Sequence, residues 1–172
     1  MLQDDRKEEL ERVLQETAGG DRPPGTMMAQ FTARCAEDAE GVLKAAKSVM
    51  CAVLVHSRDR WPPDDEWRSV LPEWFVSRCA KEKSEDEART WLEWWRTLPH
   101  EQRAIASREN WSLSNWVAWF EPDERQWIWW GAWIEGPNSI RVTVAVDGLP
   151  FAWGALEWLF LASGAESMSL EE

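Results

Sequence analysis

Residues 126–160 hold six of the fifteen tryptophans in this chain of 172 residues. Burying one indole removes roughly 150–250 Å² from water, and a broad exposed indole surface promotes aggregation. The fold must therefore either bury these side chains in a core or keep them as a surface that binds a ligand or partner. The main question is therefore which secondary-structure elements carry these tryptophans, and on which face of each element they lie.

The segment IRVTVAVD at 140–147 predicts a β-strand. Its aliphatic residues alternate with Arg141, Thr143 and Asp147, and a period of two residues places the two sets on opposite faces. Residues 127–135 are rich in tryptophan and isoleucine, and the Gly-Pro-Asn sequence between the two segments favours a turn. We therefore predict an antiparallel β-hairpin.

A closing helix is expected after the hairpin. Pro150 suits the first turn of a helix because that position needs no N–H donor, and Gly164 can supply the cap that ends it. The residues between them are apolar around most of the helix, so the helix should be buried, with Glu157 in a salt bridge or on an exposed stripe. The alternative is a desolvated Glu157 carboxylate with a raised pKa, as a general acid needs. Residues 126–164 are thus predicted to be a β-β-α unit, followed by an acidic tail at 165–172.

The preceding residues, 26–120, are predicted to be helical. Apolar residues recur at helical spacing over 42–56 and again over 85–98. Prolines and capping side chains predict where helices begin and end. These boundary residues are Thr26, Pro62, Pro63, Pro72, Ser84 and Pro99. The helix expected after Thr26 carries Met27, Met28, Phe31 and Cys35, and no strand is expected before the hairpin.

Residues 1–20 are expected to form a highly charged peripheral helix. Leu10, Val13, Leu14 and Thr17 make its only apolar stripe, and a Gly-Gly pair that can end a helix follows. A segment that becomes ordered on binding a partner is the alternative. The whole chain is then one α+β domain, predominantly helical, with a C-terminal antiparallel β-hairpin and a buried closing helix.

The charge of the chain limits the partners that it can bind. Nineteen Lys and Arg against thirty-one Asp and Glu give a net charge of −12, which repels a phosphate backbone, so direct nucleic-acid binding is not expected. From residue 126 onward Arg141 is the only basic side chain, which favours a basic partner. Acidity that serves only solubility is the alternative. No apolar run approaches the roughly 20 residues of a membrane span, and we expect a cytoplasmic protein without membrane contact.

No catalytic, metal-binding or cofactor-binding motif is found. The three cysteines form no C-x-x-C pair, and the two histidines are far apart. Phosphate-binding glycine loops, the G-x-S-x-G elbow and H-E-x-x-H are missing from the sequence. We therefore expect reduced thiols, no metal, no cofactor and a non-enzymatic role.

The candidate binding residues are Trp127, Trp129, Trp133 and Arg141. If the aliphatic faces of the two strands align, the three indoles share the other face with Arg141, and Gly131 leaves a slot between Trp129 and Trp133. The alternative is that the helices cover these indoles and make them core. A slip of one residue in register would exchange the two faces.

Three functions follow from these features. The first is a non-enzymatic interaction module that binds a protein partner, basic by charge complementarity, through an aromatic surface. The second is a small-ligand-binding protein or an unrecognised enzyme with a tryptophan-lined pocket. The third is a structural subunit that self-associates, for example as a homodimer.

Overall fold

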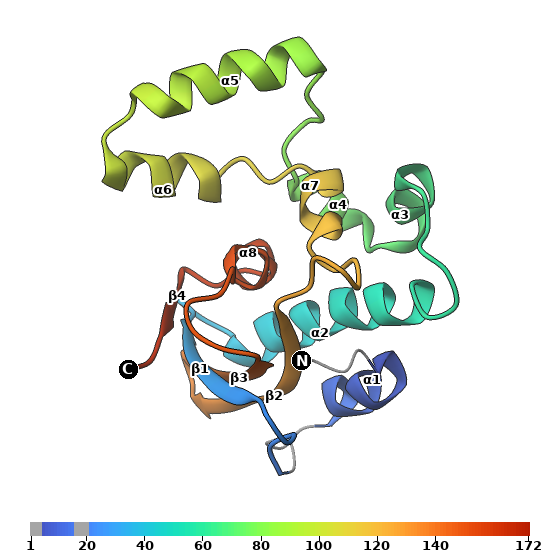
Figure 1. Ribbon diagram of the computed structural model, residues 1–172. Helices are drawn as coiled ribbons and strands as arrows, with labels where there is room; N and C mark the ends of the chain where they lie inside the picture. Colours follow the sequence, from blue (N-terminus) through green and yellow to red (C-terminus); the bar gives the residue numbers. More distant parts are fainter. Residues whose placement is uncertain (1–4, 16–20) are drawn as a thin grey trace.

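The computed structural model describes residues 5–15 and 21–172. Within them, a four-stranded antiparallel sheet has the strand order β2-β3-β1-β4, and helices pack against it (Figure 1). The strands are β1 (Met27–Arg34), β2 (Trp127–Gly136), β3 (Ser139–Val146) and β4 (Ser167–Leu170). The helices are α1 (Arg6–Leu14), α2 (Ala39–His56), α3 (Asp64–Val70), α4 (Glu73–Arg78), α5 (Glu85–Thr97), α6 (His100–Arg108), α7 (Leu113–Ala118) and α8 (Gly154–Ala162).

The predicted α+β class, the hairpin and most of the helix boundaries are confirmed. β2 and β3 pair on either side of the Pro137-Asn138 turn, and α8 follows them. α3 begins after Pro63, Pro72 separates it from α4, and the Ser84 hydroxyl caps α5 by accepting a hydrogen bond from a backbone N–H of its first turn. These boundaries could be predicted because proline and N-cap serine act on the adjacent backbone alone.

Residues 27–34 form β1, so the predicted helix after Thr26 is wrong. β1 is a central strand that pairs with β3 over its whole length and with β4 on its other side. Methionine, alanine, glutamine and arginine favour a helix locally, but pairing on both edges outweighs that preference. A strand signal was present as well, since the buried Ala29, Phe31 and Ala33 follow a period of two.

The C-terminal residues 165–172, expected as an acidic tail, contain β4. This strand pairs with the outer edge of β1, with Leu170 opposite Phe31, and Met168 is buried against the core. A short Ser/Glu-rich sequence has no strand pattern of its own. It becomes a strand here because β1 presents an edge of unpaired backbone groups to it.

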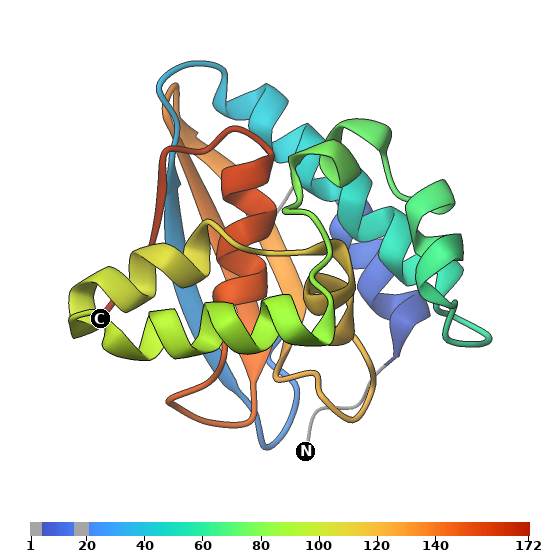
Figure 2. The ribbon, with the colours of Figure 1, turned by 90° about the horizontal axis from the view of Figure 1, so that it is seen from above.

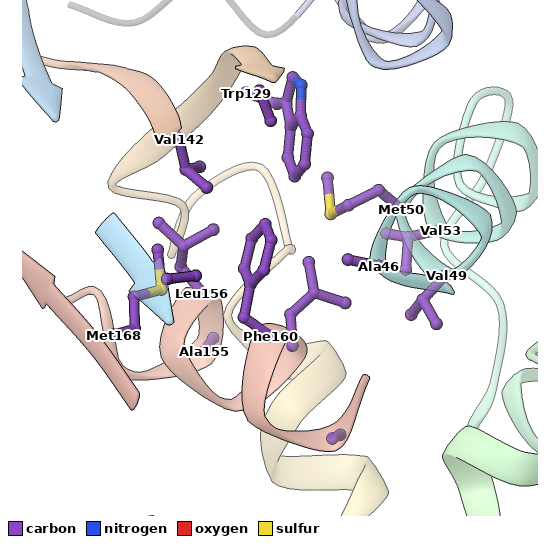
Figure 3. Packing of buried hydrophobic residues seen from close by; sticks show 14 of the residues in the cluster. Ala46, Val49, Met50, Val53, Trp129, Val142, Ala155, Leu156, Phe160 and Met168 are labelled. Carbon is purple, nitrogen blue, oxygen red and sulfur yellow. The ribbon is translucent and has the colours of Figure 1, made fainter. Parts of the chain in front are cut away.

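The core lies on one face of the sheet, between the strands and helices α2 and α8 (Figure 3). Met50 of α2 and Phe160 of α8 point toward Trp129 of β2, and the Trp129 and Phe160 rings stack with 6.0 Å between their centroids. α8 begins at Gly154 rather than at the predicted Pro150, and it is buried along most of its length as expected.

α1 is held by buried charged side chains, which differs from the loosely packed peripheral helix that was predicted. The Glu9 carboxylate accepts hydrogen bonds from Arg125 at 2.5 Å and from the backbone N–H of Trp129 at 2.7 Å. Arg6 donates to the backbone carbonyl of Phe120 at 2.8 Å. Glu9 and Arg125 are almost completely buried, so α1 is part of the packed structure. The Gly-Gly pair expected to end this helix lies outside the described residues.

We expect Glu9→Gln to destabilise the protein by roughly 3–5 kcal/mol, because it removes a buried carboxylate charge that pairs with the buried Arg125 guanidinium. Urea denaturation followed by circular dichroism measures this loss. The matched control is Glu11→Gln, which removes the same charge from an exposed position of the same helix and should change stability by no more than about 0.5 kcal/mol. Equal effects of the two substitutions would show that the buried pair does not hold α1.

Candidate functional site

A β-bulge in β2 separates the tryptophans that were predicted to share one face. Trp129 lies opposite Val144, but the next paired residue, Gly131, lies opposite Thr143, so Trp130 is an extra residue in the strand. An extra residue reverses the faces of everything beyond it, because side chains alternate along a strand. The predicted common face of the candidate tryptophans is therefore wrong.

On the near side of the bulge, Trp127 and Trp129 point into the core. They are 2% and 0% exposed, so neither indole can be part of a binding surface. Beyond the bulge, Trp133 lies opposite Arg141 on the other face of the sheet, as the sequence predicted, and is half-buried. Of the four candidate residues, the structure thus brings together Trp133 and Arg141 only.

The Arg141 guanidinium is already paired within the molecule. It donates to the Glu135 carboxylate at 2.9 Å and forms an ion pair with Glu171 of the C-terminal segment. Hydrogen bonds to Glu135 and Glu171 raise the pKa of Arg141. A ligand anion would have to displace these carboxylates, so the half-exposed Trp133 beside Arg141 is a weak site for a charged ligand.

We expect Trp129→Ala to cost about 3–5 kcal/mol of stability and Trp133→Ala about 1 kcal/mol, because only the first removes an indole from the core. Guanidinium denaturation of both variants, followed by far-ultraviolet circular dichroism, provides the comparison. Similar losses for the two would contradict the register that the bulge imposes.

Several exposed apolar side chains lie elsewhere, on a helical hairpin formed by α5 and α6. We call residues 85–108 the arm. Figures 1 and 2 show its two helices side by side, and Figure 1 shows the arm held away from the sheet. None of the thirteen residues of α5 is buried, although the helix carries three tryptophans. Trp94, Leu92 and Ile105 are 50%, 38% and 51% exposed.

Specific contacts hold the arm together. The Trp95 indole N–H donates to the Arg103 carbonyl and to the Ser107 hydroxyl, both at 3.0 Å. The Arg103 guanidinium in turn lies over the Trp95 ring, 5.1 Å from its centroid. These contacts fix α5 against α6, and Trp94 lines a shallow hollow between the two helices with Leu98 and Ile105. The exposed surface is therefore presented by an ordered hairpin.

One ion pair links the arm to α8. Arg108 of α6 lies 3.2 Å from the carboxylate of Glu157, the charged residue of the closing helix. Burial raises the pKa of Glu157, and the charge of Arg108 partly offsets this effect. The expected salt bridge of Glu157 is thus confirmed, and its partner comes from the helix that faces α8.

A cleft of about 720 Å³ lies between the arm and α7. Three indoles and three carboxylates line it, together with smaller polar side chains. These are Trp91, Trp111, Trp119, Glu82, Glu121 and Glu124. The volume is within the range of known ligand sites, roughly 300–1,000 Å³. We call this feature the acidic cleft.

The carboxylates of the acidic cleft differ in how they are held. Glu82 accepts hydrogen bonds from the backbone N–H of Ser114 at 3.0 Å and from its hydroxyl at 2.5 Å, and it pairs with Arg68 at 3.0 Å. Burial raises the pKa of Glu82, but these contacts outweigh burial and leave the pKa below its usual value. The Glu121 and Glu124 side chains make no hydrogen bond or ion pair with another residue of the described chain. Their charges are therefore available to a ligand.

The cleft already shows that its indoles can accept a cation. The Lys83 ammonium lies 5.4 Å from the centroid of the Trp91 ring. Such contacts contribute roughly 0.5–2 kcal/mol, more where water is excluded. With three carboxylates against this one ammonium, the lining carries a net negative charge.

The sequence did not predict the acidic cleft. Its lining comes from the segment before α5, from both helices of the arm, from α7 and from the segments on either side of α7. Only the folded chain brings these together. The available signal was the α5 pattern of apolar residues at helical spacing within a highly charged segment, which indicates a helix but not what covers it.

No protein-family model, curated protein or solved structure gives a significant match to this chain. In the ranges 5–15 and 21–172, no group of three or more His, Cys, Asp or Glu side chains is placed to hold a metal ion. No helix in the same ranges is both long and apolar enough to cross a membrane. The arm and the acidic cleft are therefore the features of the molecule that indicate a function.

Proposed function

We propose that the protein is a non-enzymatic, acidic interaction module that binds a basic protein partner through the aromatic surface of the arm. The observation that carries this proposal is that α5 buries none of its residues. An amphipathic helix forms in water mainly when its apolar face packs against something. The arm has an ordered internal structure but leaves Trp91, Trp95 and Leu98 of this face only half-buried, as expected of a surface that a partner covers.

The composition of the exposed surface suits a protein partner. Tryptophan is enriched among the residues that dominate binding energy, and the half-exposed Trp94 of α5 lines one hollow together with the exposed Ile105 of α6. Exposed apolar side chains that are surrounded by polar ones often mark the surfaces through which proteins bind each other. The exposed apolar side chains of the arm therefore favour binding through its outer side.

The charge of the whole chain selects the partner. The arm itself is nearly neutral, with five acidic against four basic side chains. The whole chain carries −12, so a basic surface is attracted from a distance and an acidic one is repelled. The same charge opposes self-association, which makes a homodimer through the arm the less favoured function.

A cytoplasmic location is part of this proposal. Cys35, Cys51 and Cys79 are all unpaired, which suits a compartment that keeps thiols reduced. Burial raises the pKa of the Cys79 thiol to about 11, so that thiol stays protonated and slow to oxidise.

Selection of random peptides on the purified protein at low salt tests the proposal without a known partner. We expect enrichment of sequences that combine lysine or arginine with apolar residues, and binding that weakens as salt rises. Trp94→Ala combined with Ile105→Ala should weaken binding of the selected peptides about 30-fold, which corresponds to roughly 2 kcal/mol. Fluorescence anisotropy measures the Kd of each.

The matched control is Leu149→Ala, which removes an exposed apolar side chain from a loop outside the arm and should leave each Kd within about twofold. Both variants alter exposed positions, so the melting temperature should stay close to that of the wild type. Selected peptides without basic residues, or equal binding by wild type and the arm variant, would refute the proposal.

A further inference from the structure

We infer that the acidic cleft binds an arginine side chain of the basic partner, with the guanidinium against an indole face and paired with Glu121 and Glu124. This inference rests on the proposed function, but it concerns a different surface, beneath the arm rather than on its outer side. It assigns the cleft one occupant, chosen by the charge and shape of the lining.

The first support is that two carboxylates of the cleft, which would attract a cation, lie on an ordered turn. The backbone N–H groups of Glu121 and Glu124 donate to the carbonyls of Ala118 and Glu121 at 3.1 Å and 3.0 Å, so both carboxylates follow α7 in a defined turn. Neither carboxylate makes a hydrogen bond or ion pair with another described residue, whereas Glu82 pairs with Arg68 and accepts a hydrogen bond from Ser114. Two ionised carboxylates facing a cleft favour a cation that can pair with both.

The second support is the aromatic lining. Arginine lies over an indole at several places in this molecule, for example Arg103 over Trp95 at 5.1 Å and Arg12 over Trp130 at 4.2 Å. In the cleft, Lys83 lies over Trp91, whereas no cation of the described residues lies over Trp111 or Trp119. These two indoles are therefore open to a cation supplied from outside.

Trp111 is also fixed in place before any ligand arrives. A Cβ added at Gly154 would come within 3.2 Å of the Trp111 ring, so the indole packs directly on the start of α8. A ring held by the body of the protein loses little freedom when a ligand stacks on it, which favours binding.

The third support distinguishes arginine from lysine. A guanidinium is planar, more weakly hydrated than an ammonium, and presents five donors that need several acceptors. Besides the two carboxylates, Asn110 lines the cleft. Its side-chain N–H₂ donates to the Ala106 carbonyl at 2.7 Å, and its side-chain oxygen is left as an acceptor for a ligand. Stacking surface and multiple acceptors together match a guanidinium better than a point charge.

Lys83 acts against this ligand. Its ammonium covers one indole of the cleft and repels an incoming cation. Removing Lys83 should therefore strengthen binding, whereas removing a cleft carboxylate should weaken it. A surface that binds cations only through the overall charge of the protein would respond far less to Lys83 and equally to any acidic residue nearby.

The test uses Nα-acetyl-arginine N-methylamide as the probe, with the citrulline analogue as its neutral counterpart of nearly the same shape. Titration of the full chain is followed by the ¹H–¹⁵N signals of the indole N–H groups, assigned through Trp111→Phe and Trp119→Phe. We expect saturable shifts of the Trp111 and Trp119 signals, no shift of Trp94, and binding of the citrulline probe weaker by about tenfold or more.

Charge variants then distinguish binding in the acidic cleft from attraction by the overall negative charge of the protein. Glu121→Gln with Glu124→Gln should weaken arginine binding about tenfold, and Lys83→Gln should tighten it at least about twofold. The matched control is Asp123→Asn, which removes a charge from the same exposed turn at a position that does not line the cleft, and it should change the Kd by less than about twofold.

Equal binding of arginine and citrulline, or no indole shift up to about 20 mM probe, would overturn the inference. So would equal weakening by Asp123→Asn and by the Glu121 and Glu124 changes. If peptides selected on the protein bind equally well after their arginines are replaced by citrulline, the cleft does not take the partner's side chain. Peptide binding that still depends on Trp94 would leave the proposed function intact in each of these cases.

Discussion

The buried contact between Glu9, Arg125 and the backbone N–H of Trp129 holds three distant parts of the chain together. It joins α1, the loop after α7 and the bulged edge strand β2. β2 is an edge strand, and a bulge at an edge leaves backbone groups without strand partners. The Glu9 carboxylate and the Arg12 side chain, which donates to the Trp129 carbonyl at 3.3 Å, satisfy those groups. A charged helix can therefore be an essential part of the structure.

Local signals predicted much of the fold. The β2-β3 hairpin, α3 to α7 and the buried α8 follow from alternation, proline and capping residues. β1 and β4 were missed because each is a strand only through its partners: β1 has the composition of a helix, and β4 has no apolar pattern. Strand formation by pairing is a non-local effect, so a single sequence segment reports it poorly.

The site was harder to predict than the fold. Alternation alone placed Trp127 and Trp129 beside Arg141, and one extra residue at Trp130 reversed that placement. A bulge costs little and leaves no clear mark in a strand that is apolar on both faces. The arm was readable as helices, but the sequence did not show that its apolar face is left uncovered, which depends on what lies opposite α5.

The strand order also determines when the sheet can form during synthesis. β1 is made early, yet both of its neighbours, β3 and β4, lie more than a hundred residues later in the chain. Because synthesis runs from the N-terminus, β1 leaves the ribosome with its backbone groups and Phe31 uncovered, and it stays so until β3 and β4 have been made. The period before β3 emerges is the time at which the nascent chain depends most on α2, or on a chaperone, to shield that strand.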